Sequence, residues 1–129
     1  MNLTEILQTA VESGAADIFF IAGLPVTFKK GGRQERLPGD ILMPDKIAVL
    51  ADEIYATARR DRKNLDEGQD DDFSFAIPGM GRFRANVFRQ RGSVAAVLRV
   101  IKFGLPDPAQ LGIPESVISL ADNKKGLVL

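Results

Sequence analysis

Two stretches of the chain repeat apolar residues at the spacing of an amphipathic helix. In residues 3–13 the leucine, isoleucine, alanine and valine side chains fall on one stripe, and Gly14 follows where such a helix would stop. In the second stretch, Pro44 suits a first helical turn and apolar residues recur at helical spacing between residues 47 and 54. The pattern predicts two helices, the second ending in the 60s.

Short runs rich in β-forming residues predict six strands, separated by glycine-containing or charged connections. The first three form a small meander, and the last three follow a long charged connection. The predicted strands cover residues 17–21, 26–30, 33–37, 72–77, 82–89 and 93–101. A further short helix is predicted over residues 115–122.

The segment between residues 59 and 72 is almost wholly charged, with Leu65 its only large apolar residue. This composition predicts a short exposed helix or a solvated connection. Residues 66–72 hold five acids, but their order is not that of a calcium-binding loop, so a solvated turn is favoured and no metal site is expected.

The last two predicted strands carry the candidate site. If Arg91-Gly92 is a two-residue hairpin turn, residues whose numbers sum to 183 face each other, and Arg84 lies opposite Arg99. Like charges opposite one another destabilise a sheet. An acid or a phosphate between the two guanidinium groups would remove that cost.

Composition narrows the chemistry further. The 129 residues fit one domain, carry no net charge, and contain neither cysteine nor histidine. Disulfides, thiol catalysis, Ser-His-Asp triads and His-ligated zinc are therefore excluded. The start of the chain lacks a secretion signal and no apolar run reaches transmembrane length, so the cytoplasm is the default location.

The arginines of residues 82–99 admit three interpretations. They could form a solvated face, or pair with the acids at 66–72. They could bind nucleic acid, which is disfavoured because Phe83 and Phe88 fall on opposite faces of the predicted strand and the chain has no tryptophan. The facing pair Arg84 and Arg99 favours the third interpretation, a phosphate clamp.

The last part of the chain has a different composition. Residues 103–114 hold three prolines and two glycines, which is typical of a connection, and an apolar run begins at residue 127. We expect one domain over residues 1–102, and over residues 103–129 a linker and the start of a further domain.

The run DDFSFAIPGMGRFRANVFRQRGSVAAVLRVI, at residues 71–101, resembles the amino-terminal domain of PilT-type twitching-motility ATPases. The flanks LTEILQTAVESGAADIFFIAGLP and PAQLGIPESVISLADNKKGLVL are similar to that family as well. The resemblance implies an α+β, PAS-like fold: a mostly antiparallel sheet flanked by helices.

The resemblance also implies a function. Such proteins are hexameric motors of the secretion ATPase superfamily that retract type IV pili, with partners that include the domain's own and neighbouring motor domains and a platform protein of the inner membrane. It implies no nucleic-acid partner, and a cytoplasmic place that allows peripheral contact with the inner membrane. ATP and Mg²⁺ would bind the motor domain, whose Walker A motif would follow residue 129, so this chain alone should not hydrolyse ATP.

In that superfamily, arginines of this domain meet the γ-phosphate, and the matching positions are Arg84 and Arg99. The chain departs from the family at Phe19 and Phe20, where a histidine-containing strand is usual, and Asp17 is expected to be structural. Two alternatives stay open: the same domain of a pilus-extension or type II secretion ATPase, and a stand-alone PAS-type interaction module.

Overall fold

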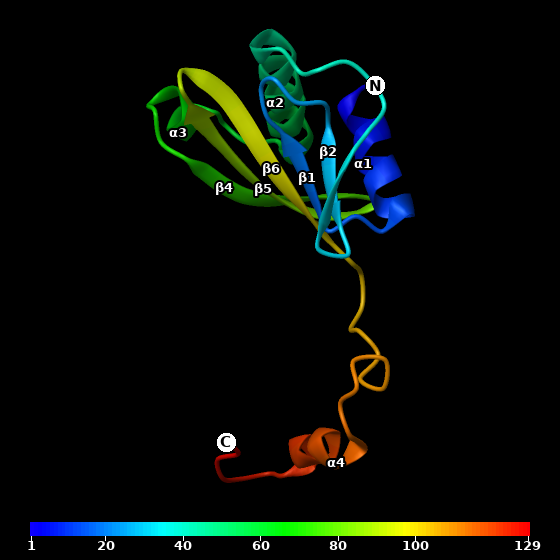
Figure 1. Cartoon of the computed structure of the whole chain (residues 1–129). Coiled ribbons are helices and arrows are strands. Elements are labelled where there is room, and N and C mark those ends of the chain that lie inside the picture. The colour runs from blue at the N-terminus through cyan, green and yellow to red at the C-terminus, as the bar shows by residue number, and fades with distance from the viewer.

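The computed structural model describes all 129 residues, and its centre is one six-stranded antiparallel sheet (Figure 1). The strand order across the sheet is β3-β2-β1-β6-β5-β4. The strands are β1 (Asp17–Phe20), β2 (Thr27–Lys30), β3 (Arg33–Arg36), β4 (Asp71–Ile77), β5 (Gly81–Gln90) and β6 (Ser93–Ile101). All six predicted strands are therefore present, and the α+β expectation is confirmed.

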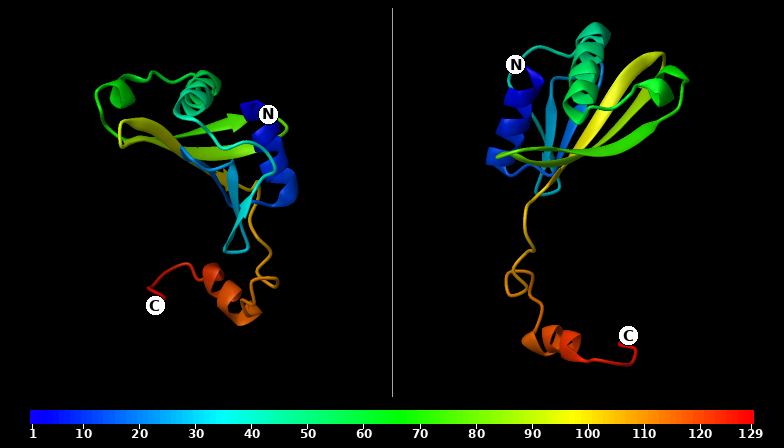
Figure 2. Two further views of the ribbon diagram at one scale, coloured as in Figure 1. Left: turned by 45° about the horizontal axis from the view of Figure 1, so that its top comes forward. Right: turned by 180° about the vertical axis from the view of Figure 1, so that it is seen from behind.

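Two helices, α1 (Leu3–Ser13) and α2 (Pro44–Ala58), cover one face of this sheet, as the rear view in Figure 2 shows. Helix α1 begins with a capping box, in which Asn2 accepts from the Glu5 amide and the Glu5 side chain accepts from the Asn2 amide. It ends at Gly14, whose φ of 73° is the left-handed conformation that glycine adopts without strain. Helix α2 carries Pro44 at its first turn, as predicted.

Helix α2 is shorter than the sequence predicts. It ends at Ala58, because Arg59 takes a left-handed conformation with φ of 51° and breaks the helical ladder. The expected end in the 60s was wrong. A separate four-residue helix, α3 (Lys63–Asp66), follows and turns Leu65 into the core.

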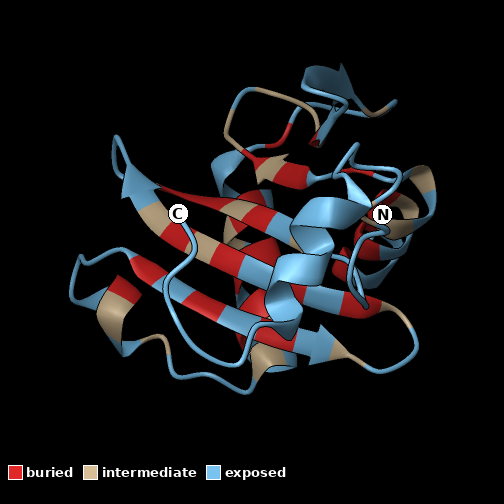
Figure 3. Cartoon of the chain, turned by 90° about the horizontal axis from the view of Figure 1, so that it is seen from below, coloured by how far each residue is buried: buried red, intermediate tan, exposed pale blue.

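The core lies between the two helices and the sheet. Along β4 and β5 buried and exposed residues alternate, as Figure 3 shows. On β5 and β6 the apolar residues of the face toward the helices are buried, with Val100 half-buried at its edge: Phe83, Ala85, Val87, Val94, Ala96 and Leu98. Both packed helices, α1 and α2, lie on this face of the sheet. The opposite face, which carries Arg84 and Arg99, has no helix packed against it.

The β5–β6 hairpin has the predicted register. Arg91 and Gly92 form its turn with φ of 51° and 80°, and Arg84 pairs with Arg99. Positive φ at both turn positions is the type I′ geometry that matches the twist of antiparallel strands. The facing arginines predicted from the hairpin register are therefore present in the structure.

Residues 102–129 leave the end of β6 and run away from the sheet (Figure 1). They contain α4 (Glu115–Ile118) and a 3₁₀ turn, η1 (Ser119–Asp122), where the sequence predicts one short helix. Residues 127–129 form no strand, and their apolar side chains are exposed. None of the helices in the chain is both long enough and apolar enough to cross a membrane.

Candidate functional site

The candidate site lies on the sheet face that carries no helix. Arg84 from β5 and Arg99 from β6 sit directly opposite each other, and their side chains are 60% and 67% exposed. A β-strand turns every second residue to the same face, so Arg82 and Asn86 accompany Arg84 on this side. Both guanidinium groups are open to solvent.

An acid from β4 holds Arg84. Asp72 accepts two hydrogen bonds from it, from Nε at 2.9 Å and from Nη2 at 2.8 Å. Asp72 pairs across the ladder with Asn86, so it reaches Arg84 diagonally. The hydrogen bonds from Arg84 lower the pKa of Asp72, and Asp72 in turn raises the pKa of Arg84. The interpretation that pairs these arginines with the acids at 66–72 describes Arg84 correctly.

Arg99 takes its acid from β1 instead. It faces Asp17 across the ladder and donates from Nε to Asp17 Oδ1 at 2.9 Å. The Asp17 side chain is only 11% exposed. Lys29 of β2 lies opposite Asp17 on its other side. Asp17 is therefore a residue of the central strand β1 that also binds the guanidinium group of Arg99.

The two ion pairs border an open hollow of about 340 Å³. Its lining residues are Asp17, Asp72, Arg84, Asn86, Val97 and Arg99. Two cations and two anions balance within it, which explains how the fold accommodates facing arginines. Chemically, the hollow can bind an oxyanion through guanidinium N–H groups that no carboxylate holds, or where an arginine exchanges its carboxylate for the ligand.

A second charged cluster is buried and was not predicted. Asp71 is 1% exposed and accepts hydrogen bonds from Arg60 at 2.8 and 2.9 Å, Tyr55 at 3.0 Å and Asn64 at 3.1 Å. The hydrogen bonds from Arg60 hold the pKa of Asp71 below its usual value. Burial, and then Asp71, raises the pKa of Tyr55. Every carboxylate oxygen has a partner, so the cluster fastens α2 and α3 to β4.

The acidic run is therefore not simply a solvated turn. Asp71 begins β4 and points into the core, whereas Asp72 points to the opposite face. Strand alternation separates these neighbours, and no group of three or more acidic side chains is placed to hold a metal ion. The signal for the buried acid was available in the sequence: Asp71 shares its parity with Phe73 and Phe75, which face the core.

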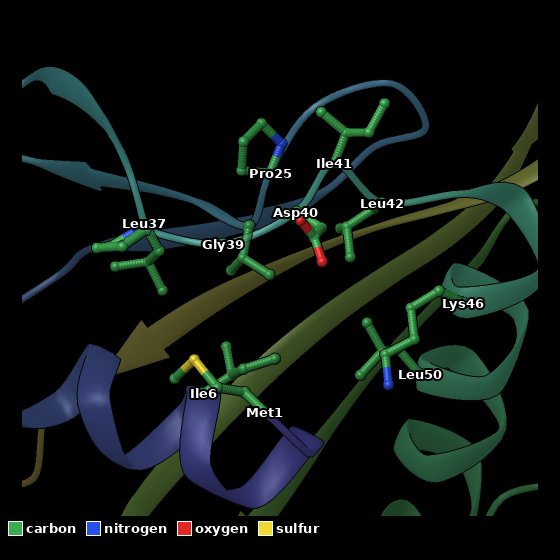
Figure 4. Close-up of a pocket in the computed structure, with 12 residues that line it drawn as sticks. Met1, Ile6, Pro25, Leu37, Gly39, Asp40, Ile41, Leu42, Lys46 and Leu50 are labelled. Carbon is green, nitrogen blue, oxygen red and sulfur yellow. The ribbon is translucent and has the colours of Figure 1, made fainter.

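A separate pocket of about 290 Å³ lies between α1, the loop before α2, and α2 itself (Figure 4). Apolar side chains such as Ile6, Leu42 and Leu50 line it, and Asp40 and Lys46 provide its charged groups. It lies on the helical side of the sheet. The pocket and the arginine hollow share no residue.

Known proteins match the whole chain. The pilus retraction ATPase PilT of Pseudomonas aeruginosa is 33% identical over all 129 residues, and the type IV pilus ATPase PilU of the same organism is 32% identical over the same span. A crystal structure of the pilus retraction motor PilT with bound ADP aligns with 95% of the chain at 38% identity and a TM-score of 0.75. This chain is similar to the amino-terminal part of PilT-type pilus ATPases.

The chain matches only about a third of the length of these PilT-type proteins. The chain spans 37% of PilT and 33% of PilU, and 36% of the solved PilT chain. The Legionella pneumophila ATPase DotB aligns with 98% of the chain at a TM-score of 0.63, but at 20% identity this similarity shows the fold alone. No protein-family model matches the chain. The six-stranded α+β fold is that of the PilT amino-terminal domain.

Proposed function

We propose that this chain is the amino-terminal domain of a hexameric ATPase that retracts type IV pili, and that Arg84 and Arg99 contact the γ-phosphate of ATP bound by a motor domain. The observation that carries the proposal is the facing arginine pair, set on exposed sheet surface. Similarity to PilT and PilU over all 129 residues of the chain supports the pilus motor.

The role of the arginines follows from their geometry. Planar guanidinium groups bind phosphate oxygens in two-point contacts, and two of them side by side spread positive charge over one oxyanion. Phosphoryl transfer gathers negative charge on the oxygens of the transferred group, so preplaced cations lower the barrier. The rigid β5–β6 ladder fixes the two strands relative to each other, which suits this task.

The remaining chemistry belongs to the motor domain. This chain contains no glycine-rich phosphate loop followed by lysine and serine or threonine, so ATP and Mg²⁺ would be held elsewhere and the chain alone would be inactive. We propose that the domain acts in the cytoplasm against its own and neighbouring motor domains, with residues 103–129 as the connection. The further partner would be a pilus platform protein at the inner membrane.

A secretion or pilus-extension ATPase would use the same domain. Among the solved structures, 38% identity to PilT against 20% to DotB favours a pilus motor over a secretion ATPase. Restoring twitching motility in a retraction-deficient strain with the complete protein would support retraction. Rescue of pilus assembly without rescue of retraction would support the extension motor.

The arginine assignment is tested in the complete protein that includes the motor domain. Arg84→Ala and Arg99→Ala should each lower the ATPase rate by about 100- to 1,000-fold, the range seen when one charge-stabilising donor is removed. Arg82→Ala is the matched control, since Arg82 lies on the same face two residues from Arg84 and makes no ion pair. Unchanged rates in both test variants would refute the role.

A further inference from the structure

The two arginines of the hollow are held in different ways. Arg84 gives Asp72 its Nε and one Nη group, so one full edge of its guanidinium is occupied. Arg99 gives Asp17 only Nε, so both of its Nη groups are free. An oxyanion that enters the hollow thus finds both Nη groups of Arg99 open, whereas the Nε edge of Arg84 is already bound to a carboxylate and only its outer N–H groups are open.

The two acids also differ in burial. Asp72 is 45% exposed, so it can leave Arg84 and be hydrated by water at little cost. Asp17 is 11% exposed, and separation from Arg99 would leave its charge poorly hydrated and without a cationic hydrogen-bond partner. Exchange of carboxylate for phosphate is therefore easy at Arg84 and costly at Arg99.

We propose that Asp72 is a displaceable internal counterion: it occupies the Nε edge of Arg84 in place of phosphate, and an incoming phosphoryl group displaces it from that edge, while Arg99 binds the same group without releasing Asp17. The inference rests on the proposed phosphate-binding role of the pair. A carboxylate that accepts two parallel hydrogen bonds from Arg84 matches the two-point contact that phosphate oxygens make. Asp72 thus lowers the affinity of the hollow for phosphate and keeps Arg84 neutralised until the ligand arrives.

The test uses the 129-residue chain and inorganic tripolyphosphate, titrated at low salt and followed by the arginine Nε–H signals in NMR spectra. Asp72→Asn should bind tripolyphosphate about twofold to fivefold more tightly than the unaltered chain, the range expected when an exposed ion pair no longer competes. The Arg84 signal should shift during the titration of this variant, and Arg99 should respond in both proteins.

The matched control is Asp70→Asn, which removes the same charge from a neighbouring exposed acid that makes no ion pair. It corrects for the general gain in positive potential. Adding Arg84→Ala to Asp72→Asn should abolish the gain. The proposal is overturned if Asp72→Asn binds no more tightly than Asp70→Asn, if the gain survives without Arg84, or if neither the unaltered chain nor Asp72→Asn binds.

The tripolyphosphate titration tests the counterion role of Asp72 independently of the proposed role of the arginines in ATP hydrolysis. Unchanged ATPase rates in Arg84→Ala and Arg99→Ala would refute the catalytic role but leave the exchange of Asp72 for phosphate intact. Equal tripolyphosphate affinities would refute the counterion while the ATPase result stood.

Discussion

Leu65 should be a major contributor to stability although it lies in a mostly charged segment. Its side chain is fully buried and belongs to the single hydrophobic core. It reaches that core from the four-residue helix α3, and Arg89 donates a hydrogen bond to its carbonyl at 3.3 Å. The residue thus fastens the connection between α2 and β4 to the sheet.

The expected cost of Leu65→Ala follows from this position. Truncation of buried leucine costs about 2 to 5 kcal/mol, and the cost falls where the surroundings can collapse into the cavity. Helix α3 is one short turn at the edge of the core, which favours the lower half of that range, about 2 to 3 kcal/mol. For a domain of this size the melting temperature should fall by about 10 °C.

Urea denaturation followed by circular dichroism measures this change, and Leu105→Ala is the control because Leu105 is 98% exposed. The control should stay within about 0.5 kcal/mol of the unaltered protein. Hydrogen exchange in residues 59–70 should accelerate in Leu65→Ala before it does in the sheet. A loss below about 1 kcal/mol, or an equal loss in the control, would refute the assignment of Leu65 to the core.

Two further outcomes are expected. The pKa of Asp71 is lowered in the folded state, so its contribution to stability is present above about pH 4 and is lost as the pH falls below that. Asp71→Asn should therefore flatten the fall in unfolding free energy between about pH 4 and pH 2. An unchanged slope in acid titrations would contradict this. Gly14→Ala should destabilise the protein by about 1 kcal/mol in thermal melts, because φ of 73° is strained for alanine although no atom lies within 4 Å of the added Cβ. Gly81→Ala is the control and should be tolerated, because Gly81 has no positive φ. Equal effects of the two substitutions would contradict the backbone argument.

Much of the fold follows from local patterns in the sequence. The β5–β6 register was predictable because a two-residue turn leaves only one pairing, and strand alternation then fixed which residues face the core. The first helix was predictable because its apolar stripe and Gly14 agree on its bounds. In these elements the turn and cap residues directly follow the strand or helix that they end, so local sequence indicates the bounds.

The partners of the charged side chains were harder to predict. Arg99 pairs with Asp17, which is 82 residues away in the chain, and no spacing rule indicates that β1 lies beside β6. Likewise, Asp71 depends on Arg60, whose position is set by the left-handed turn at Arg59 that ends α2. A non-glycine residue in that conformation leaves no compositional signal. The partners of Arg99 and Asp71 therefore depend on long-range strand order and on an unusual turn, and local sequence patterns indicate neither.

We propose that Arg84 and Arg99 contact the phosphate of a nucleotide held by another domain. The most direct measurement is a structure of the complete protein with a non-hydrolysable ATP analogue. We expect guanidinium nitrogens of both residues within about 2.7 to 3.0 Å of γ-phosphate oxygens, with Asp72 released from Arg84. A nucleotide bound in the motor domain with both arginines still paired to Asp72 and Asp17, and no phosphate within reach, in every subunit of the assembly, would contradict the claim.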